Sequence, residues 1–165
     1  MKIREFTDRD TEPVLALNAE SVWALSPLNE ASLRGHLISA DQAMICEVDG
    51  VVAAFALAYA PGSPYASINY AWHAARFDDF LYLDRIAVGV GFRRRGIATV
   101  LYDKLEATAK PRGRMVCEIS SDPPNPASLA FHLARGYREI GHLTQLDGHQ
   151  TVMMEKTLSV ERAPR

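Results

Sequence analysis

The sequence contains very little cysteine: Cys46 and Cys117 are the only two in 165 residues. They lie far apart in the chain, and neither has the closely spaced Cys or His neighbours of a zinc site. A disulfide-rich secreted scaffold is therefore excluded, and no metal site is expected. Two isolated cysteines of this kind favour reduced thiols in a cytoplasmic protein.

Long apolar runs are also missing from the sequence. No segment reaches the roughly 20 consecutive apolar residues that a membrane-spanning helix needs. The first residues, MKIREFTDRD, are polar and lack the apolar core of a signal peptide. We therefore expect a cytoplasmic location and no membrane partner.

An excess of positive charge is absent as well, because 18 Lys and Arg stand against 20 Asp and Glu and the net charge is −2. A general nucleic-acid binder needs a basic surface, so nucleic acid is not an expected partner. The length and the apolar and charged fractions are those of one ordinary globular domain. We place this domain at residues 1–158 and expect a tail at 159–165.

Local patterns predict the positions of the strands and helices. Runs of β-branched and aromatic residues indicate strands, and Asp49-Gly50 and Asp147-Gly148 are hairpin signals. Apolar spacing and capping residues indicate helices. The predicted strands are residues 2–6, 42–48, 51–59, 81–88, 115–120, 137–146 and 150–158, and the predicted helices are residues 13–22, 29–38, 97–105 and 126–135. Residues 65–80 are predicted to form a long loop with some irregular strand.

The order of these elements predicts the fold class. It runs strand, two helices, three strands, helix, strand, helix and two strands. Such an order favours an α/β fold with an antiparallel N-terminal part and a parallel crossover in the centre. We expect a mixed, partly antiparallel sheet of six to seven strands flanked by about four helices.

The segment LYLDRIAVGVGFRRRGIATVLYDKL, residues 81–105, is the most informative part of the chain. An apolar strand leads through a glycine-containing turn into a helix with one apolar stripe from Ile97 to Leu105. The first N–H groups of a helix have no intrahelical partner, and the helix dipole adds positive charge there. The arginines at 93–95 stand at the same point, and Gly96 permits close approach to the backbone. The arrangement suits a phosphate or pyrophosphate.

Two common phosphate-binding motifs do not fit this turn. Gly91 and Gly96 have the outer spacing of a Walker loop, but Ile97 and Ala98 stand where that motif has Lys and Ser or Thr. The dinucleotide fingerprint fails because Gly89 and Gly91 are not followed by a third glycine in register.

Two stretches resemble the signature motifs of the GNAT acyltransferases. The first is similar to the acyl-CoA signature (Gln/Arg)-x-x-Gly-x-(Gly/Ala), and reads Arg93-Arg94-Arg95-Gly96-Ile97-Ala98. The second is similar to N-x-x-(S/A)-x-x-(F/L)-Y-x-x-x-G-(F/Y), and reads Asn125-Pro-Ala-Ser128-Leu-Ala-Phe131-His132-Leu-Ala-Arg-Gly136-Tyr137. The order of elements extends the resemblance to nearly the whole chain. The resemblance implies a GNAT-like fold and acetyl-CoA as the co-substrate, with no metal.

The resemblance also implies a role for each matching residue. Backbone groups of the central strand would hold the pantetheine arm and the acetyl carbonyl, at Ile86, Ala87 and Val88. Backbone N–H groups of the turn would hold the pyrophosphate, at Arg93, Arg94, Arg95, Gly96, Ile97 and Ala98. Asn125 would contact the arm of acetyl-CoA and Phe131 would pack near it, and the alternative for Asn125 is a plain helix cap.

Two residues are candidates for proton transfer. Asp84 precedes the acetyl-binding segment, where the family often has an acidic residue, and would take a proton from the attacking ammonium. Its alternatives are an ion pair with an arginine, or binding of the ammonium without proton transfer. His132 stands where family members often carry the Tyr that protonates the leaving thiolate. Imidazole can act as that acid, or it can be a bystander on the helix.

The acceptor is expected to be a primary amine of a small molecule, an amino acid or a peptide. Aromatic side chains are candidates for lining its pocket, although such residues serve packing as often. The candidates are Trp23, Tyr59, Tyr70 and Trp72. The sequence therefore predicts an acetyl-CoA-dependent N-acetyltransferase, with a non-catalytic acyl-CoA-binding or sensing module as the alternative. A homodimer is left open.

Overall fold

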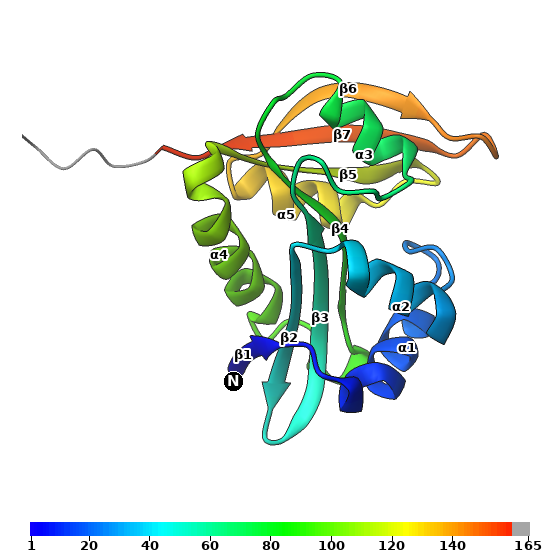
Figure 1. The fold of residues 1–165 in the computed structure, drawn as a ribbon, viewed down its shortest axis with the longest axis vertical. Helices are drawn as coiled ribbons and strands as arrows, with labels where there is room; N and C mark the ends of the chain where they lie inside the picture. The colour runs from blue at the N-terminus through cyan, green and yellow to red at the C-terminus, as the bar shows by residue number, and fades with distance from the viewer. Residues whose placement is uncertain (160–165) are drawn as a thin grey trace, which may run out of the picture. The chain divides into compact units, whose positions relative to one another are not determined.

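The computed structural model describes residues 1–159, and their strands form one mixed seven-stranded sheet in the order β1-β2-β3-β4-β5-β7-β6 (Figure 1). The strands are β1 (Lys2–Glu5), β2 (Gln42–Val48), β3 (Val51–Tyr59), β4 (Leu81–Val88), β5 (Arg114–Asp122), β6 (Arg138–Thr144) and β7 (Gln150–Thr157). The α-helices are α1 (Thr11–Glu20), α2 (Glu30–Ser39), α3 (Ile68–Ala74), α4 (Ile97–Ala109) and α5 (Pro126–Ala134). The predicted α/β class and mixed sheet are confirmed.

The chain divides into two compact units, which we describe separately. Unit 1 contains residues 1–65 and 83–105, and unit 2 contains residues 66–82 and the described residues from 106 onward. Strand β4 belongs to both, because Tyr82 ends one segment and Leu83 begins the next. The single domain at residues 1–158 stays a prediction, and the tail predicted at 159–165 lies outside the described residues from 160 onward.

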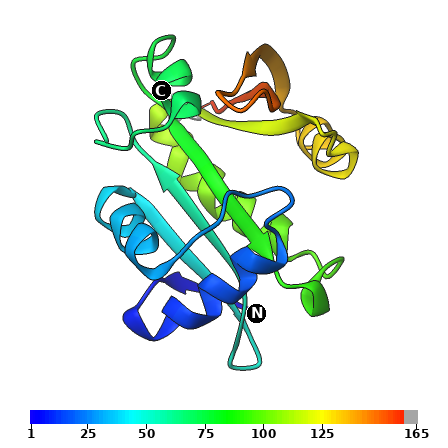
Figure 2. The same cartoon turned by 90° about the vertical axis from the view of Figure 1, so that its right-hand side faces the viewer.

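Unit 1 is built on the antiparallel strands β1, β2 and β3. Asp49 and Gly50 join β2 to β3 with φ of 51° and 79°, the left-handed values that a tight hairpin turn requires, so the predicted hairpin is confirmed. Strand β3 is buried from Ala53 to Tyr59. Helices α1 and α2 lie on one face of these strands, and the first turns of α4 lie on the other (Figure 2).

Helix α4 packs into unit 1 through the apolar stripe that its sequence predicts. Ile97, Leu101 and Leu105 are at most 1% exposed. Val100, which stands beside them in the sequence, is 37% exposed and lies off the stripe. Burying each of the three stripe residues stabilises the fold by about 1.5–3 kcal/mol. The stripe therefore anchors the beginning of α4 directly after the turn that follows β4.

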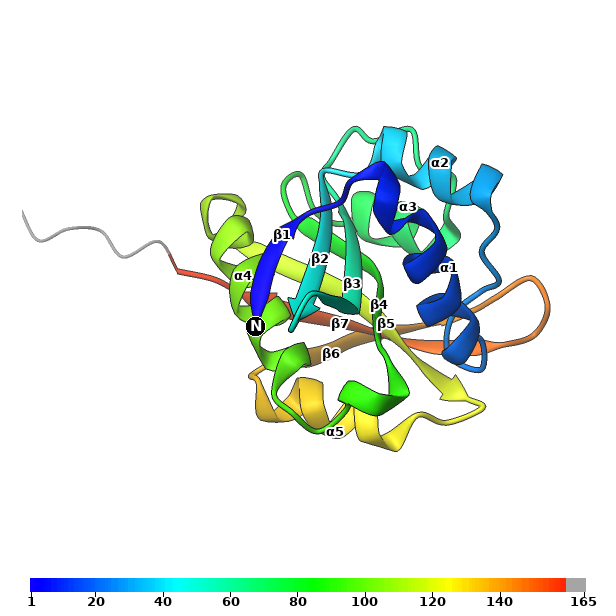
Figure 3. The same ribbon diagram turned by 90° about the horizontal axis from the view of Figure 1, so that it is seen from below.

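Unit 2 is built on β5, which pairs in parallel with Leu81 and Tyr82 of β4 and antiparallel with β7. Strand β6 pairs antiparallel with β7, so the closing hairpin is confirmed. The parallel pairing of β4 with β5 is the predicted central crossover. Figure 3 shows α3 and α5 on opposite faces of β5, β7 and β6.

The prediction of a long loop at residues 65–80 was wrong, because Ile68–Ala74 form helix α3. Ser67 caps this helix, since its side chain accepts a hydrogen bond from the Tyr70 N–H. The helix has only seven residues, too few for a periodic apolar pattern to indicate it. Tertiary packing supports it instead, because Tyr70 and His73 are buried.

The first helix is shorter than its sequence predicts. Helix α1 ends at Glu20, and Val22, expected on its apolar stripe, is 52% exposed. Beyond the helix the chain folds back, and the Asn18 side chain donates a hydrogen bond to the Ser26 carbonyl oxygen (3.0 Å). This buried hydrogen bond favours the folded-back chain over the longer helix that the apolar spacing predicted.

Candidate functional site

Strand β4 carries the residues predicted to hold the acetyl group, and its end is tightly packed within unit 1. The residues in this role are the half-buried Ile86 and Val88 and the buried Ala87. The next residue, Gly89, has little room for a side chain, because a Cβ there would lie 2.9 Å from Leu17 Cδ2. Its N–H donates to the Ala53 carbonyl oxygen (2.9 Å). The end of β4 is therefore held against both α1 and β3.

The turn after β4 has the backbone conformation of an anion-binding loop. Arg94 and Gly96 have left-handed φ of 60° and 77°, and α4 begins directly after them at Ile97. Alternating backbone conformations turn successive N–H groups toward one side, where they can hold an anion. A Cβ built on Gly96 would meet no atom within 4 Å, so a ligand can approach the backbone there. The role of Arg93–Ala98 in binding pyrophosphate fits this geometry and stays a prediction.

Arginine side chains at this turn have contacts of their own. Arg93 Nε donates to the Val88 carbonyl oxygen (3.2 Å). The guanidinium of Arg95 lies 5.5 Å from the centre of the Phe92 ring. In the predicted anion site, the backbone donors would form the ordered part and the guanidinium groups would add positive charge around it.

Asp84 lies on β4, and each of its carboxylate oxygens has a partner in unit 1. Oδ1 accepts a hydrogen bond from the Tyr65 hydroxyl (2.7 Å), and Oδ2 pairs with Arg85 Nε (3.0 Å). The Asp84 side chain is 8% exposed. Of the alternatives that the sequence left open, the ion pair with an arginine is observed.

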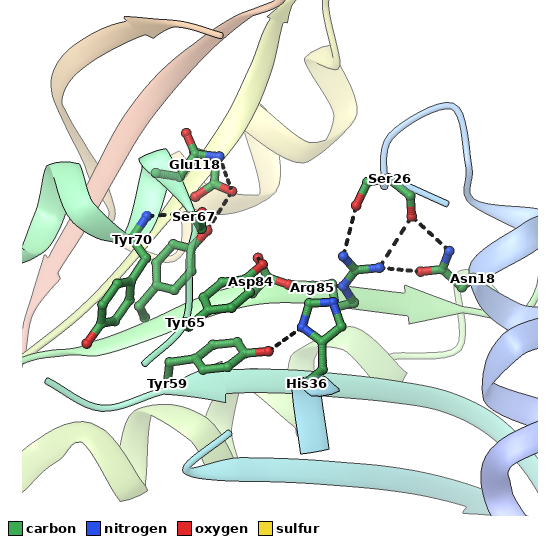
Figure 4. A network of polar contacts seen from close by, with 12 residues as sticks. Asn18, Ser26, His36, Tyr59, Tyr65, Ser67, Tyr70, Asp84, Arg85 and Glu118 are labelled. Carbon is green, nitrogen blue, oxygen red and sulfur yellow. Dashed lines mark hydrogen bonds and ion pairs between the residues drawn. The ribbon is translucent and has the colours of Figure 1, made fainter. Parts of the chain in front are cut away.

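Arg85 is a buried cation that ties β4 to the N-terminal helical segment (Figure 4). Nη1 donates to Asn18 Oδ1 (2.9 Å) and to the Ser26 carbonyl oxygen (3.3 Å), and Nη2 donates to Ser26 Oγ (2.9 Å). Sequence reasoning missed this network because Asn18 and Ser26 are 67 and 59 residues away from Arg85 in the chain.

Three rings of unit 1 pack together beside Asp84 (Figure 4). Tyr59 and Tyr65 stack, with ring centres 4.1 Å apart and 7° between their planes. His36, from α2, contacts the Tyr59 hydroxyl through Nδ1 (2.5 Å), and its ring centre lies 5.3 Å from that of Tyr65. Neither His36 nor Tyr65 belongs to a motif, so the sequence did not predict that these two residues contact each other.

Burial controls protonation in this cluster. It lowers the pKa of His36, and the positive charge of Arg85 adds to the effect. Burial also raises the pKa of Tyr59 and of Tyr65, and the negative charge of Asp84 contributes further. At neutral pH the imidazole is therefore uncharged and both hydroxyls keep their protons. Tyr65 then remains a hydrogen-bond donor to Asp84.

The aromatic residues predicted to bind the acceptor differ in exposure. In unit 1, Trp23 is 60% exposed, whereas Tyr59 is fully buried and contacts Tyr65 and His36. In unit 2, Tyr70 is buried, with its ring edge against Tyr82 at a centre distance of 5.8 Å. Tyr59 and Tyr70 therefore have packing roles, and contact of any of these residues with the acceptor stays a prediction.

Trp72 is also a packed residue of unit 2. A Cβ built on Gly141 of β6 would lie 2.6 Å from Trp72 Cζ2, so the indole rests directly on this glycine. The Arg76 guanidinium lies 3.4 Å from the ring centre. The indole thus joins α3 to the sheet, and its contact with the acceptor stays a prediction.

Two residues that are predicted to lie near acetyl-CoA, Asn125 and Phe131, are at helix α5 of unit 2. Asn125 caps the helix, since its Oδ1 accepts a hydrogen bond from the Ser128 N–H (3.2 Å). The helix-cap interpretation is therefore observed, and contact with acetyl-CoA stays a prediction. Phe131 lies edge-on to His132, with ring centres 5.5 Å apart, and its packing near the co-substrate also stays a prediction.

His132 is 5% exposed, and its Nδ1 lies 2.7 Å from the Ser128 carbonyl oxygen. A carbonyl only accepts, so we assign the proton to Nδ1. Burial lowers the pKa of His132, and the hydrogen bond to Ser128 offsets part of the effect. The imidazole is therefore neutral near pH 7, and this environment does not favour the predicted general acid. That role stays a prediction.

Residues 1–159 contain no group of three or more His, Cys, Asp or Glu that is placed to hold a metal ion. None of the helices in this part of the chain combines the length and the apolar character needed to cross a membrane.

Comparison with known proteins shows matches in sequence and in fold. Residues 6–137 match the acetyltransferase (GNAT) family. The L-2,4-diaminobutyric acid acetyltransferase of Nocardia farcinica (strain IFM 10152) is 31% identical over 103 residues, which are 62% of this chain and 46% of that protein. This chain therefore spans about half the length of that relative.

Solved structures extend the comparison to nearly the whole chain. Ard1 from Thermoplasma volcanium has a TM-score of 0.76 at 20% identity, with 95% of this chain and 97% of that one covered. The putative acetyltransferase yncA from Salmonella typhimurium, with its cofactor acetyl-CoA, has a TM-score of 0.71 at 18% identity, with 100% and 98% covered. At these identities the structures show a shared fold.

Proposed function

Because this chain belongs to the GNAT family of acetyltransferases, we propose that it transfers the acetyl group of acetyl-CoA to a primary amine by direct attack. One observation carries the proposal. Strand β4 leads into a left-handed turn at Arg94 and Gly96, directly before the N-terminus of α4. Backbone donors, the helix dipole and positive charge meet at this turn, and the pyrophosphate of acetyl-CoA matches that set.

The residues of unit 1 fit the remainder of the co-substrate. The open space over Gly96 admits a bulky anion close to the backbone. The pantetheine arm carries amide groups, which pair naturally with the N–H and C=O groups of a strand such as Ile86–Val88. The structural neighbour yncA, determined with acetyl-CoA, supports the choice of co-substrate.

The proposed chemistry needs a neutral amine, so the acceptor ammonium must first lose a proton. Asp84 is the proposed base. The amine nitrogen then forms a bond to the thioester carbonyl carbon, and collapse of the tetrahedral intermediate breaks the C–S bond. The second proton of the attacking nitrogen passes to the departing CoA thiolate, directly or through solvent, so that the amide and the free thiol are released. A thiolate is a tolerable leaving group even without protonation, so we expect replacement of His132 to slow the reaction less than replacement of Asp84.

The acceptor is proposed to be a primary amine of a small molecule, an amino acid or a peptide. The similar protein from Nocardia farcinica acts on L-2,4-diaminobutyric acid, which is an amino acid. A structural neighbour from Escherichia coli acts on an alanine of ribosomal protein S18. Both acceptor classes therefore belong in a test panel.

A non-catalytic acyl-CoA-binding or sensing module remains the second candidate. The observation that favours it is His132, which replaces the usual Tyr and is neutral and hydrogen-bonded to Ser128. The two candidates share the turn at Arg93–Ala98 and differ only in turnover.

Turnover of acetyl-CoA against a panel of amines separates the candidates. The panel contains diamino acids, simple primary amines and peptides with free N-termini, and free thiol release is followed together with mass spectrometry of the product. Release that depends on the amine, with an acetylated product, is the expected result. Tight acetyl-CoA binding without release for any amine would favour the sensing module.

A further inference from the structure

The geometry points to Tyr65 as a positioning residue for Asp84, whose hydroxyl holds the carboxylate in the orientation that receives the proton of the acceptor ammonium. This inference rests on the proposed function and deepens it. Tyr65 lies in the segment after β3 and outside both family-like motifs. Its hydroxyl donates to Asp84 Oδ1 at 2.7 Å, so its connection to the proposed base is direct.

Two fixed points define the plane of a carboxylate, and Asp84 has one on each oxygen. Arg85 Nε holds Oδ2 at 3.0 Å. The other guanidinium nitrogens of Arg85 donate to Asn18 and Ser26. The Tyr65 hydroxyl holds Oδ1 at 2.7 Å. Contacts on both oxygens resist rotation of the carboxylate about its Cβ–Cγ bond, and Tyr65 supplies a contact on Oδ1.

The ring of Tyr65 is itself held in place, so the hydroxyl is a preorganised donor. It stacks on Tyr59 at a centre distance of 4.1 Å, and the His36 ring lies at 5.3 Å. Tyr59 is in turn fixed by its contact with His36 Nδ1 (2.5 Å). A donor held in this way loses little side-chain entropy when it orients its partner.

Protonation distinguishes a positioning role from a catalytic one. Burial and the neighbouring Asp84 raise the pKa of Tyr65, so the hydroxyl keeps its proton at neutral pH. It therefore donates to the carboxylate and does not take the ammonium proton itself. Tyr65 acts on the reaction through Asp84.

Tyr65→Phe tests this role, because it removes the hydroxyl and keeps the ring that stacks on Tyr59. We expect kcat to fall about tenfold, the size of one oriented hydrogen bond to a reacting group, while the affinity for acetyl-CoA is unchanged. Both are measured with the full chain and an amine on which the unmodified protein turns over.

A double-mutant cycle shows whether the effect passes through Asp84. In an Asp84→Asn background, Tyr65→Phe should reduce kcat no further, because the carboxylate that it orients is already gone. A second tenfold loss in that background would show that Tyr65 acts elsewhere and would overturn the inference.

Tyr137→Phe is the matched control. The Tyr137 hydroxyl donates to Glu106 Oε1 (3.2 Å), and Glu106 also pairs with Arg135, so the same atom is removed from a similar carboxylate in unit 2. We expect unchanged kcat for this variant. An equal fall in both variants, or unchanged kcat in Tyr65→Phe, would overturn the positioning role alone. Absence of turnover by the unmodified protein would overturn the proposed function, and this inference with it.

Discussion

Asp84 is the residue whose surroundings say most about the proposed chemistry. Its carboxylate is largely buried and has a cation and a hydroxyl as partners. The same partners mean that replacing it has structural consequences. Arg85 is 5% exposed, and a buried cation that loses its counter-ion is costly to the folded state.

We predict that Asp84→Asn keeps acetyl-CoA binding and loses most of the turnover near neutral pH. Loss of a general base costs about a hundredfold to ten-thousandfold in rate. The rate should recover partly at higher pH, where more acceptor amine is already neutral. Steady-state kinetics over a pH series, with calorimetry of CoA binding to confirm the fold, provide the measurement. Near wild-type turnover at all pH values would mean that water or another residue takes the proton.

At the scale of elements, the turn between β4 and α4 is the proposed anion site. Gly96 has a φ of 77°, which residues with a side chain rarely adopt, and α4 begins directly after it. We predict that Gly96→Val weakens CoA binding by about tenfold or more, because a β-branched residue strains the turn and fills the approach to the backbone. Calorimetry with CoA measures the effect.

Gly91→Val is the control in the same turn. A Cβ on Gly91 would meet no atom within 4 Å, and Gly91 is not among the residues with left-handed φ. Its CoA affinity should stay within about twofold of the unmodified protein. Unchanged affinity in a folded Gly96→Val protein would place the pyrophosphate elsewhere.

The packing of α3 within unit 2 gives a second prediction at the scale of elements. Gly141→Ala should destabilise the protein by about 1–3 kcal/mol, since the new Cβ would lie 2.6 Å from Trp72 Cζ2. Gly35→Ala in α2 is the matched control, because its Cβ meets no atom within 4 Å and a helical Gly→Ala change stabilises by up to about 1 kcal/mol. Urea denaturation measures the free energy of unfolding of both variants. Equal values would contradict the close contact between Gly141 and Trp72.

For the whole molecule, buried histidines predict sensitivity to acid. Burial lowers the pKa of His36, His73 and His132, and brings that of His73 from 6.5 to about 4. His73 is fully buried, and neither ring nitrogen makes a hydrogen bond of ordinary geometry to a described residue, although the Cys117 backbone lies close enough to offset part of the shift. Above pH 6.5 the His73 ring is mostly neutral in both the folded and the unfolded protein, so its titration does not lower the free energy of unfolding.

Below pH 6.5 the unfolded chain takes up the His73 proton first, so folded stability falls until about pH 4. The loss from His73 is roughly 3 kcal/mol at most. Asp10 adds to the loss of stability mainly below pH 4, because its carboxyl has a pKa near 3.8 in the unfolded chain and the Arg4 guanidinium lowers the folded pKa to about 2. His73→Gln should flatten the dependence of stability on pH between 6.5 and 4, measured by urea denaturation. The same slope in both proteins would contradict this prediction.

The sequence predicted those turns and helix faces of this protein that depend on residues close together in the chain. The hairpin at Asp49-Gly50 depends on two residues that tolerate left-handed backbone, and the burial of Ile97, Leu101 and Leu105 follows from helical spacing. The seven-strand mixed sheet follows from the order of such elements.

Helix α3 marks the limit of local reasoning within one element. Its seven residues are too few for a periodic pattern, and its stability comes from rings that pack in unit 2. For His132, the motif predicted the position in the chain but not the protonation of its ring. Its tautomer and lowered pKa follow from burial and from the Ser128 carbonyl oxygen.

The sequence by itself determined the family-like motifs, the glycine turn before α4 and the place of Asp84 on a strand, because each is written in consecutive or regularly spaced residues. Only the tertiary structure decided what surrounds Asp84. Tyr65 is 19 residues away in the chain, and the Asn18 and Ser26 groups that orient Arg85 are 67 and 59 residues away. Hydrogen bonds over such separations depend on how strands and helices pack together, and no local pattern specifies them.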